Sequence, residues 1–319
     1  MKPYAIGVDI GGTTVKLGLF TSDGELLDKW EIPTRTENGG AQVLPDVAAA
    51  LTAKLKEKGI PQDQVEGIGV GVPGPVDERY VVHKCVNLGW GVISIKDEMN
   101  RLMPAIPNVA AGNDANVAAL GELWQGGGKG KGHDSTVMFT LGTGVGGGVV
   151  LGSRIVAGTN GGAGEVGHMT VEPDEKIMCS CGKYGCLEQY ASASGVVNLA
   201  KRMLAACDKP SALRAMDVFT AREICDLARD GEEMAMDIVE KCSDYLGRAM
   251  SYVACTMDPD IFIVGGGMSR AGAVLTDAIL KYYRKYAFHV SANTGVVIAR
   301  LGNDAGIYGC AKMILGGEL

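Results

Sequence analysis

The sequence has few of the features that mark membrane, secreted or nucleic-acid-binding proteins. It contains no run of 18 apolar residues, so no transmembrane helix is expected. It has nine cysteines, an odd number that excludes a complete set of intramolecular disulfides. The net charge is -7, and basic residues cluster only in a short Lys/Gly alternation at 129–131. Nucleic acid and anionic membranes are therefore not expected as partners.

Only three residues precede the first expected strand, so we expect neither a signal peptide nor an appended DNA-binding segment, and we expect a cytoplasmic protein. The length of 319 residues suggests two domains, and the 46% of apolar residues can fill substantial cores. The 47 glycines are well above the usual share of about 7% and cluster between expected strands. Such clusters indicate backbone that approaches a ligand closely.

Two parts of the chain repeat the pattern of strand, Gly/Thr turn and strand. The first covers 4–20 with its turn at 11–14, and the second covers 136–151 with its turn at 142–144. The repeat predicts a duplicated fold in which each half contributes one phosphate-binding hairpin. The glycine- and lysine-rich stretch 126–132 lies between them and is a candidate domain boundary. Apolar periodicity predicts helices at 43–58, 115–124, 193–206, 232–257 and 304–315, and another from Ser269 to about Tyr286.

The first turn has the residue types that bind a nucleotide phosphate. Asp9 is followed by Gly11, Gly12, Thr13 and Thr14. Glycine N–H groups and threonine hydroxyls can donate to phosphate oxygens, and the acid can hold hydrated Mg²⁺. A Gly-Gly turn alone is more often structural, and the sequence has no P-loop motif. The second turn, with Gly142 and Thr143, favours the functional interpretation.

Two other polar or glycine-rich junctions are ambiguous by themselves. Asn113 and Asp114 lie where a short strand meets a helix, so Asp114 is either a helix N-cap or a candidate base. Gly265 and Gly266 follow a buried strand, where the backbone could approach a nucleotide. A triple glycine also serves as a close contact between a helix and a strand.

Three closely spaced cysteines and a histidine predict a metal site. Cys179, Cys181 and Cys186, with His168 eleven residues upstream of the first, complete a tetrahedral Zn²⁺ set. Cys-x-Cys spacing excludes a disulfide between the first two cysteines. Four protein ligands leave no open position, so the site would be structural, although coincidental buried cysteines are an alternative. Glu165 and Glu188 lie close to these ligands in sequence, and the metal would fix both carboxylates.

Taken together, the motifs resemble the ROK family (repressor, open reading frame, kinase). The resemblance covers essentially the whole chain, from Asp9-x-Gly-Gly-Thr to Gly-Asn-Asp-Ala-Gly306. The segments Val-Pro-Gly-Pro-Val-Asp77 and Asn-Leu-Gly-Trp90 resemble those of the family's bacterial ATP-dependent glucokinases. The resemblance implies phosphorylation of glucose to glucose 6-phosphate, with ATP, Mg²⁺ and structural Zn²⁺ as cofactors. A homodimer or homotetramer is also implied.

The resemblance further implies an α/β, two-domain, actin-like and hexokinase-like ATPase fold. Its small domain would cover 1–115 together with a returning helix at 304–319. Its large domain, with the zinc knuckle, would cover 116–303. A cleft between the domains would hold the substrates.

The resemblance also assigns roles to individual residues. Asp114 would be the general base that takes the proton from the sugar 6-hydroxyl. The sugar would be bound by Asn87, Asn113, Asp114, Glu165, His168 and Glu188. The phosphates would be faced by Asp9, Gly11, Gly12, Thr13, Thr14, Gly142 and Thr143. The adenosine would be approached by Gly265 and Gly266. The zinc ligands would be His168, Cys179, Cys181 and Cys186.

Other functions remain open at this point. A related kinase of the family could act on N-acetylmannosamine or fructose, and one sugar substituent is often worth only ~1–3 kcal/mol. A non-catalytic sugar-sensing regulator would need a DNA-binding segment before the first hairpin. A nucleotide switch of the actin or heat-shock type would need the two hairpins but neither the Asn-Asp pair nor the Glu-x-x-His motif.

Overall fold

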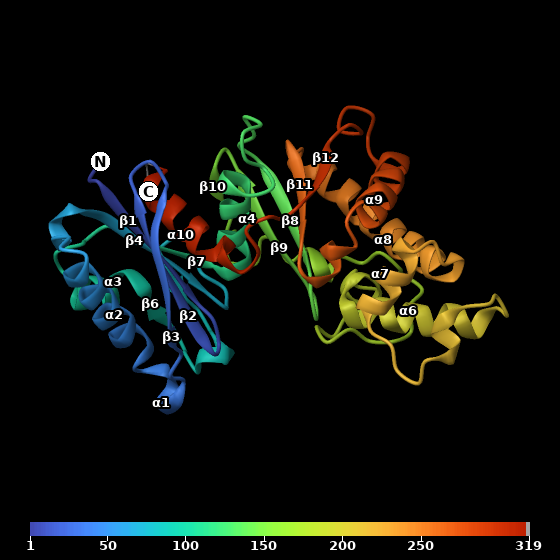
Figure 1. Ribbon diagram of the computed structural model, residues 1–319, viewed down its shortest axis with the longest axis horizontal. Coiled ribbons are helices and arrows are strands. Elements are labelled where there is room, and N and C mark those ends of the chain that lie inside the picture. The colour runs from blue at the N-terminus through green and yellow to red at the C-terminus, as the bar shows by residue number, and fades with distance from the viewer. Residues whose placement is uncertain (317–319) are drawn as a thin grey trace. The chain divides into compact units, whose positions relative to one another are not determined.

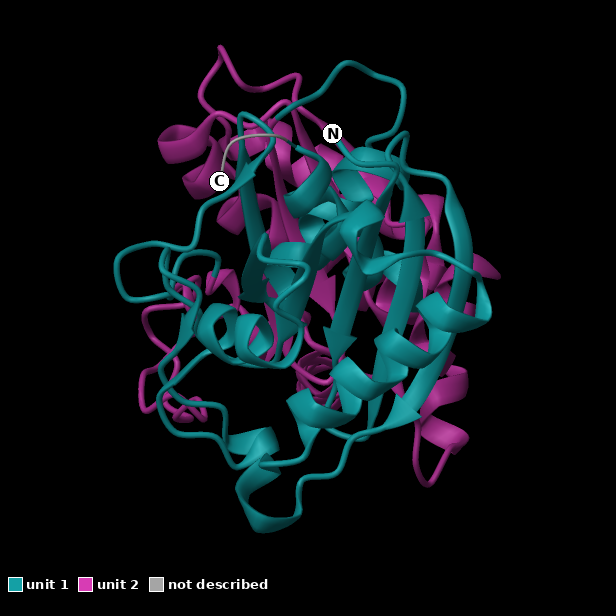
Figure 2. Cartoon of the chain, turned by 90° about the vertical axis from the view of Figure 1, so that its left-hand side faces the viewer, with its two compact units in different colours: residues 1–134, 148–164, 303–319 teal, residues 135–147, 165–302 magenta. Residues whose placement is uncertain are grey.

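The computed structural model describes residues 1–316, which fold into two compact units (Figure 2). The first unit comprises 1–134, 148–164 and the segment that begins at Asn303. The second unit comprises 135–147 and 165–302. Each unit is an α/β structure built on a sheet, as expected. Within residues 1–316, no helix is both long and apolar enough to cross a membrane.

The first unit is built on a sheet of order β3-β2-β1-β4-β7. Antiparallel pairing joins β1 (Tyr4–Ile10) to β2 (Thr14–Thr21) and β2 to β3 (Leu26–Pro33). On the other side of β1, β4 (Val65–Val72) and β7 (Val109–Asn113) continue the sheet in parallel. The turn between β1 and β2 is the predicted first hairpin turn.

The two faces of this sheet differ because side chains alternate along each strand. Ile6, Val8 and Ile10 enter a core with α2 (Val43–Glu57) and α3 (Ile95–Leu102). On the opposite face, a Cβ at Gly7 or Gly69 would collide with the backbone of α10 (Ala305–Leu315). The glycines therefore let α10 lie directly on the sheet, on the side away from α2 and α3 (Figure 1).

Helix α4 (Asp114–Gln125) follows β7 and packs closely against α10, where a Cβ at Gly121 would collide with the carbonyl of Ala305. This packing places α4 and the chain as far as residue 134 in the first unit. The expected boundary between 115 and 116 differs from this division, because it would separate α4 from its partner helix. Residues 317–319 of the expected returning segment lie outside the described residues.

The second sheet repeats the strand order of the first, as β10-β9-β8-β11-β12. Its central strand β8 (Thr136–Leu141) pairs in parallel with β11 (Ile261–Gly265), which pairs in parallel with β12 (Gly295–Ile298). The border between the two units falls within β9 (Val145–Leu151), which pairs antiparallel with β10 (Arg154–Ile155). The repeated order confirms the predicted duplication.

Helices of the second unit are α5 (Glu188–Ala191), α6 (Ala193–Ala206), α7 (Ala221–Arg229), α8 (Glu233–Met257) and α9 (Ala273–Tyr286). Helix α7 begins with a capping box made by Thr220 and Glu223. The short elements are α1 (Glu37–Gly40), β5 (Val81–Val82), β6 (Ile93–Ser94), η1 (Gln62–Gln64), η2 (Val86–Leu88), η3 (Val166–His168), η4 (Ala212–Ala215), η5 (Gly267–Ala271) and η6 (Gly302–Asp304).

Candidate active site

The first hairpin turn is held by its own backbone and by β3, and its tip is exposed. Gly11 N–H donates to the carbonyl of Thr14 at 3.0 Å, and the hydroxyl of Thr34 donates to the carbonyl of Gly11 at 2.7 Å. Gly12 has no positive φ, and the nearest atom to a Cβ placed there is Cβ of Asn87, at 3.9 Å. The turn and Asn87 are thus neighbours, and the protein's own packing does not require glycine at position 12.

Asp9 lies just before this turn, where β1 meets the start of α10. Its carboxylate is so close to Gly306 that a Cβ there would collide with it. Burial raises the pKa of Asp9 to about 6, the negative charge of Asp114 adds to the increase, and Lys16 opposes it. Lys16 itself donates from Nζ to the carbonyl of Asn303 at 2.8 Å, along the outside of the sheet. The first unit therefore places two carboxylates, Asp9 and Asp114, near each other.

Asn113, and not Asp114, is the N-cap of α4. Its Oδ1 accepts from the N–H groups of Ala115 and Asn116 at 3.0 and 3.3 Å, and its Nδ2 donates to the carbonyl of Gly74 at 3.1 Å. The alternative in which Asp114 is the cap is therefore wrong, because the amide before it satisfies these donors. Asp114 is the first residue of α4 and is partly exposed, and its Oδ1 accepts from Ala115 N–H at 2.8 Å.

The second turn, 142–144, joins β8 to β9 and contacts a carboxylate predicted to bind sugar. Val145 N–H donates to Oε2 of Glu188 at 3.0 Å, and a Cβ at Gly144 would collide with that carboxylate. Thr143 is exposed, and a Cβ placed on Gly142 would meet no atom within 4 Å. Gly142 has no positive φ, so open space, and not backbone strain, distinguishes this position.

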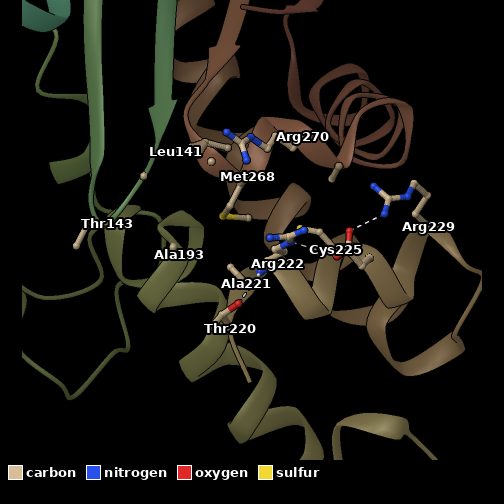
Figure 3. A pocket seen from close by; sticks show the side chains of 14 residues that line it. Leu141, Thr143, Ala193, Thr220, Ala221, Arg222, Cys225, Arg229, Met268 and Arg270 are labelled. Carbon is tan, nitrogen blue, oxygen red and sulfur yellow. Dashed lines mark hydrogen bonds and ion pairs between the residues drawn. The ribbon is translucent and has the colours of Figure 1, made fainter. Parts of the chain in front are cut away.

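Beside this turn lies a cavity of about 550 Å³, within the range of small-molecule sites (Figure 3). Gly142 and Thr143 line one side, and α7 and η5 line the others. The cavity also contains Arg222, Arg229 and Arg270, with Arg229 paired to Asp226 at 2.5 Å. Sequence reasoning missed these arginines, because they lie far from the glycine turns in the chain and belong to no recognised motif.

Gly265 and Gly266 do not line this cavity, although Gly267 does. Gly266 has a φ of 84°, and a Cβ there would collide with the backbone of Leu141 at the end of β8. At Gly265 a Cβ would meet the side chain of Met138. These two glycines therefore serve the close packing of β11 on β8, and their neighbour faces the cavity.

The predicted metal ligands come together in the second unit. One ligand atom from each of His168, Cys179, Cys181 and Cys186 lies within 4.8 Å of all the others. The Sγ atoms of Cys181 and Cys186 are 3.6 Å apart, and Nδ1 of His168 is 3.9 Å from Sγ of Cys179. Tetrahedral Zn²⁺ with the usual bond lengths separates such atoms by about 3.6–3.8 Å. The donor set and its spacing therefore fit zinc.

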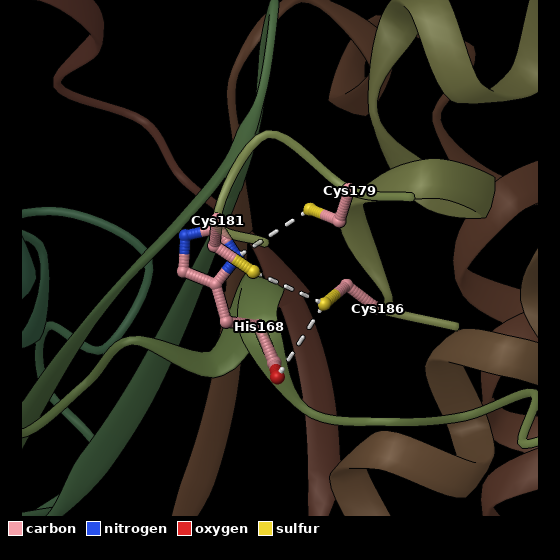
Figure 4. A group of neighbouring side chains, drawn as sticks. All are labelled: His168, Cys179, Cys181 and Cys186. Carbon is pink, nitrogen blue, oxygen red and sulfur yellow. Dashed lines mark hydrogen bonds between the residues drawn. The ribbon is translucent and has the colours of Figure 1, made fainter. Parts of the chain in front are cut away.

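The histidine of this cluster has a second ring nitrogen that points away from the cysteines (Figure 4). His168 ends η3, and Glu165, which precedes η3, is exposed. The other predicted sugar ligand of this unit, Glu188, begins α5, two residues after Cys186. The second unit thus carries Glu165, His168 and Glu188 around its cysteine cluster, whereas Asn87, Asn113 and Asp114 are carried by the first unit.

Comparisons with known proteins agree with these motifs. The model of the ROK family matches residues 5–316, so the chain belongs to the ROK family. It is 40% identical to a glucokinase of Halalkalibacterium halodurans, over 96% of this chain and 93% of the relative. It is 31% identical to an N-acetylmannosamine kinase of Shigella boydii, over 98% of this chain and 99% of the relative. A solved ROK glucokinase from Streptomyces griseus, in complex with glucose and AMPPNP, superposes with a TM-score of 0.71 at 34% identity, covering 98% of this chain and 100% of that chain.

Proposed function

We propose that this chain is an ATP-dependent glucokinase, which transfers the γ-phosphoryl group of ATP to the 6-hydroxyl of glucose. The proposal rests chiefly on the similarity, over nearly the whole chain, to glucokinases, one of which was solved with glucose and an ATP analogue. The two glycine turns and the partly exposed Asp114 supply the groups that this reaction requires.

The nucleotide would use the groups around the two turns. The cavity beside Thr143 would receive the adenosine, with Gly265 and Gly266 supporting its wall. The turns at 11–14 and 142–143 would donate N–H and hydroxyl groups to the phosphates. Asp9 would hold hydrated Mg²⁺, whose positive charge would favour the ionised carboxylate. When bound, Mg²⁺ supplies charge neutralisation for the phosphoryl group.

Asp114 would accept the proton of the sugar 6-hydroxyl. Phosphoryl transfer has a loose transition state in which the attacking oxygen needs little activation, so an aspartate can act as a base late in the reaction. The remaining hydroxyls would be held by carboxylate, amide and imidazole groups, namely Asn87, Asn113, Glu165, His168 and Glu188. Asn113 already uses its Oδ1 and one Nδ2 proton within the protein, which leaves the second Nδ2 proton for the sugar.

The Cys₃His cluster would hold a structural Zn²⁺. His168 would bind the ion through Nδ1, which leaves Nε2 for a sugar hydroxyl. The metal would supply a closed cross-link between η3 and the segment 179–186, and the catalytic groups themselves come from other residues.

The test is to identify the product. Purified protein incubated with glucose, ATP and Mg²⁺ should form glucose 6-phosphate, measured by NADPH formation with glucose 6-phosphate dehydrogenase. The matched control is 6-deoxyglucose, which lacks the accepting hydroxyl and should give no phosphorylated product. Release of ADP without glucose 6-phosphate would contradict the proposal.

A second candidate is an N-acetylmannosamine kinase, favoured by the 31% identity to the relative with that activity. It would use the same base and turns, so it differs from the first candidate only in the sugar. The higher identity to glucokinases makes glucose the first choice.

A further inference from the structure

The turn at 142–144 is hydrogen-bonded to the chain segment that follows the cysteine cluster. Ala193 N–H donates to the carbonyl of Gly142 at 2.8 Å. The hydroxyl of Ser194 donates to the carbonyl of Thr143 at 3.3 Å. Together with the bond from Val145 N–H to Glu188, segment 188–194 contacts the turn at residues 142 and 143 and the first residue of β9.

The same segment is tied to the metal-binding residues. Oε1 of Glu188 accepts from the hydroxyl of Ser180, which lies between two cysteine ligands, at 3.4 Å. Its Oε2 is the atom that binds Val145 N–H. One carboxylate therefore contacts Ser180, between two of the cysteines, through one oxygen and the end of the turn, at Val145, through the other.

The histidine side of the cluster reaches the same point of the turn. A Cβ at Gly167, next to His168, would collide with the carbonyl of Val145. The backbone of Val145 is thus contacted from η3 through Gly167 and from α5 through Glu188. Val145 is therefore held by Gly167, next to His168, and by Glu188, two residues after Cys186.

We propose that Ser194 and Glu188 are positioning residues for the turn at 142–144. Their contacts keep the sugar-binding carboxylate of Glu188 and the phosphate-binding turn in a fixed relative position. The inference rests on the proposed function, because it takes the turn to bind ATP phosphates. Ser194 contacts the turn through the carbonyl of Thr143, and its hydroxyl also shares a hydrogen bond of 3.1 Å with the hydroxyl of Ser192, whereas Glu188 would act on both the turn and the sugar. The two contacts therefore have separable kinetic consequences.

The first variant is Ser194→Ala, which removes one hydrogen bond to the turn and leaves Glu188 in place. It should raise the KM for ATP and the Kd for AMPPNP about two- to tenfold, with the KM for glucose unchanged. Amide hydrogen exchange at 142–145 should become faster. Ser194→Thr, which keeps the hydroxyl, should restore the wild-type KM for ATP and Kd for AMPPNP. Ser211→Ala is the control, because its hydroxyl caps the separate element η4.

The second variant is Gly144→Ala, whose Cβ would push the carboxylate of Glu188 away from the turn. It should raise the KM values for both ATP and glucose at least several-fold, with a circular dichroism spectrum like that of the wild type. Should this variant fail to fold, Ser194→Ala still tests whether these contacts position the turn. Unchanged ATP kinetics and unchanged hydrogen exchange in Ser194→Ala, with an active wild type, would overturn the inference alone. A wild type that forms no sugar phosphate would instead overturn the proposed function.

Discussion

At the scale of single residues, Asp114 carries the central assignment. Asp114→Asn keeps the size and shape of the side chain but removes its ability to take a proton. We expect kcat to fall about 10²- to 10⁴-fold while glucose binding stays within a few-fold of the wild type. Steady-state kinetics and calorimetric titration of glucose measure the two effects.

The matched control for this variant is Asp97→Asn, because Asp97 also lies in the first turn of a helix of the first unit. It should leave kcat unchanged and cost only the small stabilisation that an acid gives a helix N-terminus. Should Asp114→Asn and Asp97→Asn behave alike, Asp114 has only a structural role.

A second residue-scale prediction concerns Asp9 and pH. Its pKa rises from 3.8 to about 6 on folding, so between these pH values the folded state keeps a proton that the unfolded state has lost. The wild type therefore loses stability as pH rises through this window, and above pH 6 the ionised, buried carboxylate costs up to about 3 kcal/mol. Asp9→Asn should remove this cost.

The measurement for Asp9 is the urea midpoint with EDTA and without nucleotide. The midpoint of Asp9→Asn relative to the wild type should increase from pH 4 to pH 6.5 and then stay constant. Asp23→Asn, which changes an exposed acid in a hairpin turn, should show no such trend. A difference between Asp9→Asn and the wild type that is the same at all pH values would contradict the raised pKa.

Residue types in the sequence indicated most of the site, but not how each side chain is used. The pair Asn113-Asp114 was recognisable, yet an acid and an amide are about equally good N-caps. The extended backbone of Asn113, with φ of -62° and ψ of 142°, and the hydrogen bonds of its Oδ1 show that it is the cap. Cavity residues such as Arg222 and Arg270 could not be predicted, because tertiary packing of α7 and η5 brings them to the turn.

At the scale of elements, the two glycine turns give a prediction that separates ligand binding from folding. A Cβ at Gly142 would meet no atom of the protein within 4 Å, and Gly142 has no positive φ. Gly142→Val should therefore fold normally but raise the KM for ATP at least tenfold, because the side chain would occupy space needed by phosphate oxygens. Gly12→Val, in the first turn, should behave in the same way.

The control for these variants is Gly295→Val in β12, which also has open space and no positive φ but lies outside both turns. Thermal unfolding and ATP kinetics should be measured together. Normal ATP kinetics in Gly142→Val would mean that the turn is only a structural hairpin connection.

The sequence predicted most long elements within a few residues, because their apolar periodicity is strong. The helix expected from Ser269 is an exception. The hydroxyl of Ser269 donates to the carbonyl of Gly266 at 2.7 Å, so it stabilises the 3₁₀ turn η5. Gly272, with a φ of 65°, then interrupts the chain, and α9 starts at Ala273. A serine before an apolar run can either accept a hydrogen bond as a helix N-cap or donate one to a nearby backbone carbonyl, and the sequence does not reveal which of the two it does.

At the scale of the whole molecule, the strand-turn-strand repeat was enough to predict the duplicated fold. The glycine-rich stretch 126–132 lies just before the first border, between 134 and 135, but the other borders were not predictable, because the first unit also includes 148–164 and the segment from Asn303. Contacts such as Gly121 against Ala305 join parts of the chain that are distant in sequence. Composition can indicate a candidate boundary, but it does not show which helices will pack together.

Metal removal is a prediction at this scale, because the cluster would join segments that we propose to bind both substrates. Purified protein should contain about one zinc per chain by plasma emission. Cys181→Ser should lose the metal and bind both glucose and AMPPNP more weakly, whereas the control Cys207→Ser should retain both affinities, since Cys207 is exposed and outside the cluster. Metal-free Cys181→Ser with normal glucose affinity would show that packing alone holds the sugar-binding carboxylates.

The most direct test of the central claim is the specificity for the sugar. The measurement is kcat/KM with ATP and Mg²⁺ for glucose, N-acetylmannosamine and fructose. One coupled assay that detects ADP release is used for all three sugars on the same preparation. We predict that the value for glucose exceeds each of the others by at least tenfold. A value for N-acetylmannosamine or fructose equal to or above that for glucose would contradict the glucokinase assignment, while leaving the fold and the family unchanged.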